Sequence, residues 1–375
     1  MKFIISSLEL NYLINKIQNV VSLKPPMPVL SNFLIEAFND ELIFIATDLT
    51  VGIRCATEAT ILEEGSITLP AKKFAQLVRE FPTLNVEISS NKNDVVTVIA
   101  GTSRFKLNGM DAKTYPALPD FAGAVSFKLS QADLKELFYR TAFAVAREEN
   151  RYLLIGIYMQ ISNGVATFTG TDGKRLARST VHIEIDPLFH YQSIIPLKAV
   201  EEVLKNLQDE GDATVYLMPD KIGFEANQSL LIAKLLVGDY PDLNRIIPEK
   251  SDLIIPIHRE ELMTLLRQIS LFLNQQHLSA RFSFQEGELH LVANAVDIGE
   301  GNVSMVVDYQ GPQFEIALNP VFFLDMLRHC KEEVVTLGLN DAYSPGVLTD
   351  GLKNNPPQTN VSSLFLIMPM RLTEA

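Results

Sequence analysis

Apolar and polar residues follow two periods along the chain, and these periods replace each other in a fixed order. The first residues alternate, which predicts a strand at 2–6. Apolar residues then recur with the spacing of one buried helix face, which predicts a helix at 8–22. Short alternating runs separated by turn residues predict strands at 33–38, 41–47 and 51–57.

A second helix is predicted at 70–81, because Pro70 can open a helix without losing a hydrogen bond. Strands at 85–89, 95–100 and 104–108 complete this pattern, which then returns twice. The second copy has predicted helices at 130–147 and 196–207, with strands at 127–129, 152–161, 164–170, 175–183, 213–218, 221–226 and 230–237. The third copy has predicted helices at 258–272 and 319–331, with strands that include 253–257 and 364–370.

Landmark residues confirm that the pattern repeats with a period of about 125 residues. They are Thr47-Asp48 with Thr171-Asp172, Pro70 with Pro196 and Pro320, and Tyr115-Pro116 with Tyr240-Pro241. Solenoid repeats have periods of about 20–50 residues, so each copy here is long enough to be a domain. We therefore predict three domains of one design, at residues 1–121, 122–249 and 250–375.

Two helices and about eight short strands in each copy predict an α+β fold, with helices packed on antiparallel sheets. Repetition of one design also suggests a ring. Helices packed 8–10 Å apart would enclose a hole of roughly 5–9 Å if six of them lined it, and roughly 20–28 Å if twelve did. The larger hole accommodates a DNA duplex, so a head-to-tail homodimer is the expected closure.

The charge distribution changes this picture more than the total charge does. The chain has 375 residues, enough for several cores, and a net charge of −13, which argues against a general nucleic-acid coat protein. The six predicted helices, however, carry 13 basic and 9 acidic residues, a net charge of +4. These cations are either ordinary solvated helix residues or one electropositive surface that attracts phosphates without reading sequence.

Candidate catalytic chemistry is absent from the sequence. No phosphate-binding glycine loop, zinc-protease motif or nucleophile elbow occurs, and the six histidines lack metal-ligand spacing. We expect no enzyme activity, no metal and no cofactor, and we interpret Asp48 and Asp172 as turn caps. Two cysteines, Cys55 and Cys330, are typical of a reducing cytoplasm, and no apolar run is long enough for a membrane span.

Four segments together resemble the bacterial sliding clamp family, the beta subunit of DNA polymerase III, and the resemblance extends over essentially the whole chain. They are Pro70-Ala71-Lys72-Lys73-Phe74, Thr171-Asp172-Gly173-Lys174-Arg175-Leu176, Gly238-Asp239-Tyr240-Pro241-Asp242 and Met368-Pro369-Met370-Arg371-Leu372. The resemblance implies a ring-shaped homodimer of six clamp domains that encircles duplex DNA and tethers the replicative polymerase. It implies no enzymatic activity, and opening by an ATP-driven clamp loader.

The resemblance also implies a groove between the second and third domains that binds short, partly apolar peptides of the replicative polymerase, the clamp loader and repair polymerases. The matching residues are Arg151, Leu154, Thr171, Gly173, Lys174, Arg175, Leu176, Pro241, Arg245, Ile246, Leu366, Met368, Pro369, Met370 and Arg371. Apolar and methionine side chains make an adaptable trough. Without the resemblance, Met368 and Met370 are equally consistent with core packing of a last strand.

Two further sets of residues follow from the same comparison. The DNA-facing candidates are Lys24, Lys72, Lys73, Arg79, Arg140, Tyr152, Lys198, Arg267 and Arg328. Each of these could also be only a solvated face residue. The expected dimer contacts are Lys73 and Phe105 of the first domain, and Leu271, Phe272 and Glu300 of the third.

Three departures from the family pattern concern the proposed sites. Thr373-Glu374-Ala375 continue beyond the usual end, Lys174 stands where the best-known members have His, and Leu153 follows Tyr152 where two aromatic residues are often found. Lys174 adds positive charge to the groove, and Leu153 weakens base stacking. A different class of function stays open, a three-domain scaffold that binds partner peptides but no nucleic acid, as the acidic total alone would suggest.

Overall fold

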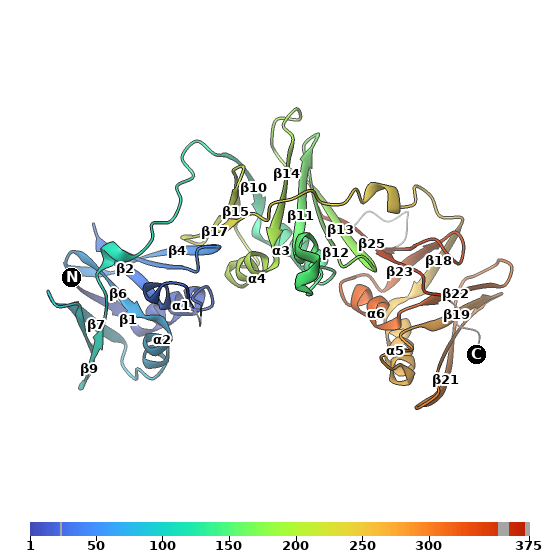
Figure 1. Ribbon diagram of the computed structural model, residues 1–375, viewed down its shortest axis with the longest axis horizontal. Helices are drawn as coiled ribbons and strands as arrows, with labels where there is room; N and C mark the ends of the chain where they lie inside the picture. The colour runs from blue at the N-terminus through green and yellow to red at the C-terminus, as the bar shows by residue number, and fades with distance from the viewer. Residues whose placement is uncertain (23–24, 352–359, 372–375) are drawn as a thin grey trace. The chain divides into compact units, whose positions relative to one another are not determined.

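The computed structural model describes residues 1–22, 25–351 and 360–371, and for 149–151 the backbone only. The chain divides into two compact units (Figure 1). Unit 1 contains Met1–Leu134 and Lys198–Leu235, and unit 2 contains Lys135–Leu197 and Leu236–Ala375. The central third of the sequence therefore contributes to both units.

Unit 1 consists of two antiparallel sheets and the helices packed on them. The five-stranded sheet has the order β5 (Thr60–Glu63), β1 (Lys2–Ser6), β7 (Asn85–Ser90), β8 (Val95–Ala100) and β9 (Ser103–Asn108). The eight-stranded sheet has the order β10 (Val125–Ser130), β15 (Asp212–Leu217), β16 (Lys221–Ala226), β17 (Ser229–Lys234), β4 (Val51–Glu58), β3 (Glu41–Thr47), β2 (Asn32–Phe38) and β6 (Gly65–Pro70). Its helices are α1 (Ser7–Ile17), α2 (Ala71–Arg79) and α4 (Leu197–Asn206), with short 3-10 helices η1 (Pro28–Ser31) and η2 (Ala112–Thr114).

Unit 2 repeats this plan. Its eight-stranded sheet has the order β14 (Tyr191–Pro196), β11 (Gly156–Ser162), β12 (Val165–Thr171), β13 (Arg175–His182), β25 (Ser362–Ile367), β24 (Gly346–Asp350), β23 (Val334–Leu339) and β18 (Leu253–His258). The four-stranded sheet has the order β21 (Gly299–Val306), β20 (Glu288–Ala295), β19 (Ala280–Gln285) and β22 (Phe314–Leu318). The helices are α3 (Gln131–Ala142), α5 (Arg259–Ile269) and α6 (Pro320–Arg328), with 3-10 helices η3 (Glu149–Ile155), η4 (Asn244–Ile246) and η5 (Ser270–Phe272).

Each eight-stranded sheet is assembled from two groups of strands that lie far apart in the sequence, and one strand pair joins the two groups. In unit 1, β4 pairs with β17 so that Gly52 lies opposite Ile232. In unit 2, β13 pairs with β25 so that Leu176 lies opposite Leu366. Each strand pairing in the described residues is antiparallel, which confirms the α+β prediction of helices on antiparallel sheets.

Local sequence explains the hairpins and helix starts of this fold. Asn39 and Asp40 adopt positive φ values of 50° and 61° between β2 and β3, as a tight left-handed hairpin turn requires. Asn163 occupies the corresponding turn between β11 and β12. The Asn319 side chain caps α6 by accepting from the backbone N–H of Val321 at 2.9 Å, and Pro320 then begins the helix.

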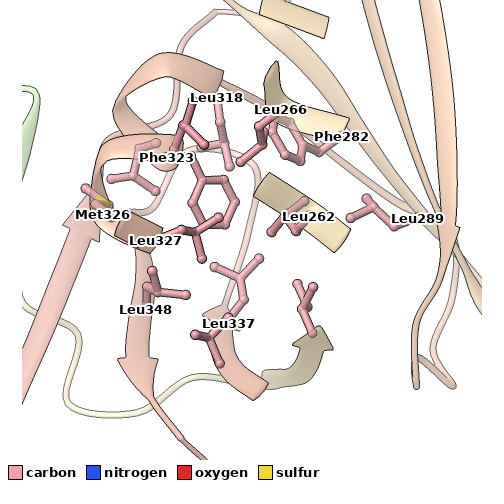
Figure 2. Close-up of a cluster of buried hydrophobic side chains, with 14 of the residues drawn as sticks. Leu262, Leu266, Phe282, Leu289, Leu318, Phe323, Met326, Leu327, Leu337 and Leu348 are labelled. Atoms are coloured by element: carbon pink, nitrogen blue, oxygen red, sulfur yellow. The ribbon is translucent and has the colours of Figure 1, made fainter. Parts of the chain in front are cut away.

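The core of unit 2 lies between its helices and sheets (Figure 2). Leu262 and Leu266, one helical turn apart on α5, point toward Phe323 and Leu327 of α6, and all four are 0% exposed. Phe282 from β19 packs against Phe323 with the two ring centroids 5.8 Å apart. Burial of each such side chain stabilises the fold by about 1.5–3 kcal/mol.

Several element predictions were wrong in detail. The first helix ends at Ile17 instead of residue 22, and β5 and β14 were not predicted. Pro70 ends β6 by pairing opposite Asn32, so α2 begins one residue later than expected. Residues 152–155 form a 3-10 helix, and the strand predicted at 152–161 begins only at Gly156.

Candidate partner-binding site and helix cations

The turn between β12 and β13 is built from Thr171 to Arg175. The Asp172 carboxylate accepts from the backbone N–H groups of Lys174 at 2.9 Å and Arg175 at 3.0 Å, and the Thr171 hydroxyl accepts from Gly173 N at 3.1 Å. Gly173 has a φ of +82°, which glycine adopts without strain. The prediction that Asp172 caps a turn is confirmed.

Arg175 is held by contacts on every side. Its guanidinium donates to Asp172 Oδ2 at 3.1 Å, to Asp325 Oδ2 at 2.8 Å and to the Phe143 carbonyl at 3.1 Å. It also lies over the Phe322 ring, 4.6 Å from the centroid, and its side chain is only 11% exposed. Arg175 therefore orders the turn against α3 and α6, and its charge is largely compensated.

On the opposite face of β13, the neighbouring Leu176 belongs to an apolar patch. Because side chains alternate along a strand, Arg175 and Leu176 point to opposite faces of the sheet. Leu176, Leu243 and Leu366 form the buried floor of this patch. Tyr240, Ile247, Val347 and Leu364 pack around it and are partly exposed. These seven residues are called the apolar patch below.

Residues 238–247 form one wall of the apolar patch. The Tyr240 ring stacks on Tyr158 with 4.7 Å between centroids and 4° between planes, and burial raises the pKa of Tyr240. Asp242 accepts from the backbone N–H of Asn244 at 3.1 Å and thereby orders η4. The predicted groove residues Pro241, Arg245 and Ile246 are exposed on this wall.

The other wall is the chain that follows β25. Met368 N donates to the Lys174 carbonyl at 3.0 Å, which joins this segment to the turn before β13. Met370 N donates to the Ala317 carbonyl at 2.8 Å. Met368 and Pro369 are half-buried, whereas Met370 and Arg371 are exposed. The structure thus places Lys174 beside Met368 and Leu176 beside Leu366.

A hollow of about 240 Å³ adjoins the turn, on the helix side of the sheet. It is lined by Val145, Ala146, Arg147, Glu148, Asp172, Lys174, Arg175 and Phe322. Leu154 is half-buried in η3, where its carbonyl accepts from Ala146 N at 2.9 Å. The side chain of Arg151 lies outside the described residues.

Sequence reasoning missed several residues of this site. Tyr240, Leu243, Val347 and Leu364 belong to the apolar patch, and Arg147 and Phe322 line the hollow. Leu243, Ile246 and Ile247 could have been found as a cluster of apolar residues in the segment after β17. Val347 and Phe322 carry no local signal, because long-range pairing alone brings their elements to the site.

The DNA-facing candidates of unit 1 lie mostly on α2. Lys72, Lys73 and Arg79 are exposed there, and Arg79 donates to Gln18 Oε1 at 2.9 Å. Lys198 is 43% exposed and pairs with Asp48. Lys24 lies outside the described residues.

The candidates of unit 2 divide into exposed and buried residues. Tyr152, Arg267 and Arg328 are exposed. Arg140, by contrast, is 4% exposed and pairs with Glu136 at 2.9 Å and Asp350 at 2.8 Å. A buried guanidinium between two carboxylates is a structural ion pair, because exposing it would leave those charges unpaired. We therefore remove Arg140 from the DNA-facing set.

The expected dimer contacts lie near two sheet edges. Phe105 is on β9, the last strand of the five-stranded sheet, with its ring 6.1 Å from that of Phe81. Glu300 is on β21, the last strand of the four-stranded sheet. Leu271 is 74% exposed, whereas Phe272 is half-buried against Gly301.

Within the described residues, no group of three or more His, Cys, Asp or Glu side chains could hold a metal ion. Both cysteines are buried thiols. None of the helices in the described part of the chain has the length and apolar content that a membrane crossing needs.

Three family descriptions match the chain in series. They are DNA polymerase III beta subunit N-terminal domain at residues 1–119, central domain at 128–242 and C-terminal domain at 244–371. A protein named Beta sliding clamp from Chlamydia pneumoniae is 50% identical over 372 residues, which cover 99% of each chain. A protein of the same name from Pseudomonas putida is 30% identical, over 95% of this chain and 96% of the relative.

Solved structures agree with these matches. The DNA polymerase sliding clamp from Bacillus subtilis has a TM-score of 0.93 and 26% identity, with 100% of both chains covered. A sliding clamp from Pseudomonas aeruginosa, solved bound to griselimycin, has a TM-score of 0.93 and 27% identity, covering 99% of this chain and 100% of that one.

Proposed function

Because the chain belongs to the DNA polymerase III beta subunit family, the bacterial beta sliding clamps, we propose that it works as a ring of two copies around duplex DNA. In this proposal the ring tethers the replicative polymerase and other partners to DNA, catalyses no reaction and acts in the cytoplasm. Each copy supplies three clamp domains, at residues 1–121, 122–249 and 250–375.

The charge of α2 is the observation that supports DNA binding in this proposal. This helix has three cations and no acidic residue, although the chain as a whole has a net charge of −13. Phe74 and Val78 are buried, so Lys72, Lys73 and Arg79 project from the opposite, solvent-facing side. Such a helix attracts phosphates through counterion release and carries no information about base sequence. The other proposed DNA-facing residues are Lys24, Tyr152, Lys198, Arg267 and Arg328.

The dimer proposal rests on two strand edges. An edge strand presents unpaired backbone N–H and C=O groups, which readily pair with another chain. The β9 edge exposes Arg104 and Lys106, whereas the β21 edge exposes Glu300. We propose that β9 of one copy meets β21 of the partner, with Lys73, Phe105, Leu271 and Phe272 beside the contact. A head-to-tail contact of this kind closes a ring.

The partner-binding proposal rests on the apolar patch. Its floor is buried and its walls expose Ile246 and Met370, so an extended peptide with apolar side chains can cover them. Arg151, Leu154, Arg245 and Arg371 would contact the rest of the peptide. A related clamp that was solved bound to griselimycin supports the view that this fold holds a ligand.

Retention on DNA of different topology tests the ring. After loading by a clamp loader and ATP, the protein should stay on a nicked circular duplex and leave once a restriction enzyme cuts the circle. Equal retention on circular and linear DNA would contradict sliding. Failure to bind either DNA, with peptide binding intact, would favour the alternative of a scaffold that binds partners without nucleic acid.

A further inference from the structure

The charges around the hollow beside the Thr171–Arg175 turn suggest which peptides this chain accepts. We infer that Lys174 and Arg147 select partner peptides in which a carboxylate group accompanies the apolar residues. This inference rests on the proposed peptide site and adds a chemical preference to it. The carboxylate is either an Asp or Glu side chain or the C-terminus of the peptide.

Arg175 lines the hollow but is not the receptor for this carboxylate. Its guanidinium already donates to Asp172 at 3.1 Å, to Asp325 at 2.8 Å and to the Phe143 carbonyl at 3.1 Å. Two carboxylates therefore compensate its single charge. A ligand carboxylate would gain little from Arg175, because the carboxylates of Asp172 and Asp325 repel it equally.

Lys174 and Arg147 differ from Arg175 in this respect. Both side chains are exposed, and among the described residues neither has a hydrogen-bond or ion-pair partner. The charged residues that line the hollow are three cations, Arg147, Lys174 and Arg175, and two carboxylates, Glu148 and Asp172. The hollow thus holds an uncompensated positive charge, which attracts a carboxylate.

Lys174 lies in the turn that leads into β13, between the hollow on the helix side of the sheet and the apolar patch on the opposite face. Its backbone N–H donates to Asp172 at 2.9 Å, and its carbonyl accepts from Met368 N at 3.0 Å. The base of the side chain is therefore held by both flanking segments, while the side chain itself is exposed. Leu176, two residues after Lys174, belongs to the floor of the apolar patch.

The size of the hollow limits what it can hold. Pockets for whole small-molecule ligands measure about 300–1,000 Å³. A hollow of about 240 Å³ is smaller, which suits one acidic side chain or one chain end. The apolar residues of the same peptide would lie on the apolar patch, so the two regions recognise different parts of one ligand.

Matched probe peptides test this preference. All probes carry the same leucines and phenylalanine and form two matched pairs. In one pair an Asp is replaced by Asn, and in the other a free C-terminus is replaced by an amidated one. Fluorescence titration of the full chain should show binding about two- to fivefold tighter for the Asp or free-acid probe than for its neutral match. Whichever acidic probe gains affinity identifies the source of the carboxylate.

Charge reversal in the protein gives the second readout. Lys174→Glu and Arg147→Glu should each remove or invert the preference for the acidic probe over its neutral match. Arg281→Glu is the control, because it makes the same charge change on an exposed residue of β19. A thermal melt of each variant shows whether the fold is retained.

The possible failures are distinguishable. If the acidic and neutral probes bind the unmodified chain equally well, the carboxylate preference is wrong while the peptide site stands. The preference is also wrong if Arg281→Glu affects the acidic probe as much as Lys174→Glu does. If none of the probes binds at all, the proposed peptide site itself fails.

Discussion

Arg175 donates to Asp325 at 2.8 Å although 150 residues separate them in the sequence. This contact joins the start of β13 to α6, and Arg328 approaches the same carboxylate from the other side at 3.0 Å. The Arg175 side chain is 11% exposed and the Arg328 side chain is 51% exposed. One carboxylate therefore takes part in a buried and an exposed ion pair.

This difference predicts unequal effects of two alanine substitutions. Arg175→Ala should lower the free energy of unfolding by about 2–4 kcal/mol, because it removes the guanidinium donors to Asp172 Oδ2, Asp325 Oδ2 and the Phe143 carbonyl. Arg328→Ala should cost less than about 1 kcal/mol, as exposed pairs do. Urea unfolding of both variants measures the two values. Similar losses would show that burial does not decide the strength of these pairs.

His329 predicts a pH dependence of the stability of unit 2. Its ring stacks on Phe143 with 4.0 Å between centroids, and its Nδ1 donates to the Asp325 carbonyl at 2.7 Å. Burial lowers the pKa of His329 below its ordinary value of 6.5, and the charges of Arg175 and Arg140 act in the same direction.

The sign of the effect follows from this lowered pKa. Below pH 6.5 the unfolded chain takes up a proton at residue 329 that the folded chain still excludes, so stability is full above pH 6.5 and decreases as the pH falls toward the folded pKa. His329→Gln should reduce this decrease. Urea unfolding of both proteins between about pH 8 and 5 tests it; parallel curves would contradict a role for His329.

Most of the fold could be predicted from the sequence because its elements carry local signals. The helix around Leu262 and Leu266 has a regular apolar stripe, and the hairpin at Asn39 has turn residues between alternating strands. The stretch from Tyr152 to Ile155 misled the prediction, because aromatic and apolar residues favour a strand. The contact of the Leu154 carbonyl with Ala146 instead holds it in a 3-10 helix.

The site was predictable only where the family resemblance supplied it. The Thr171–Arg175 turn and the segment from Met368 were expected, and they are joined by Met368 N and the Lys174 carbonyl. Arg140 looked like any exposed helix cation, since its partner Asp350 is more than two hundred residues away. Pairings of that range leave no trace in local composition.

A glycine that distinguishes the copies gives a third prediction. Gly170 in β12 stands where the first copy has Ala46, and a β-carbon there would lie 2.3 Å from the Thr141 carbonyl oxygen. Because that oxygen belongs to the backbone of α3, it cannot move easily. Gly170→Ala should therefore destabilise the protein by about 1–3 kcal/mol.

Gly52→Ala is the comparison for this substitution. Its β-carbon would lie 2.5 Å from Leu118 Cδ2, the end of a flexible side chain that can rotate away. The loss of stability should be smaller for Gly52→Ala than for Gly170→Ala. It should largely disappear when Gly52→Ala is made in a chain that already carries Leu118→Ala. Thermal or urea unfolding of the unmodified chain, the single variants and the double variant measures these differences. A larger loss for Gly52→Ala would show that side-chain relaxation is not available there.

Substitution of Met370 or Ile246 should weaken partner binding without affecting assembly of the dimer. Met370→Ala and Ile246→Ala should each weaken an apolar probe peptide by about 1–2 kcal/mol, because each removes part of an exposed wall of the proposed site. Both residues are at least a third exposed, so folding and assembly should be unaffected. Point variants are preferable to removal of residues 366–375, which would cut into β25. Unchanged affinity in fluorescence titration would remove this assignment.

Lys73 predicts the strength of the proposed dimer. Lys73→Glu places a negative charge near the contact proposed for the β21 edge, where Glu300 is exposed. Replacement of attraction by repulsion should weaken dimerisation about fivefold or more.

Lys92→Glu is the matched control, since it reverses an exposed lysine in the turn between β7 and β8 of the same unit. Sedimentation at several protein and salt concentrations measures the dissociation constant. An equal shift for both variants would indicate a general effect of net charge, and an unaltered profile for Lys73→Glu would place the dimer contact elsewhere.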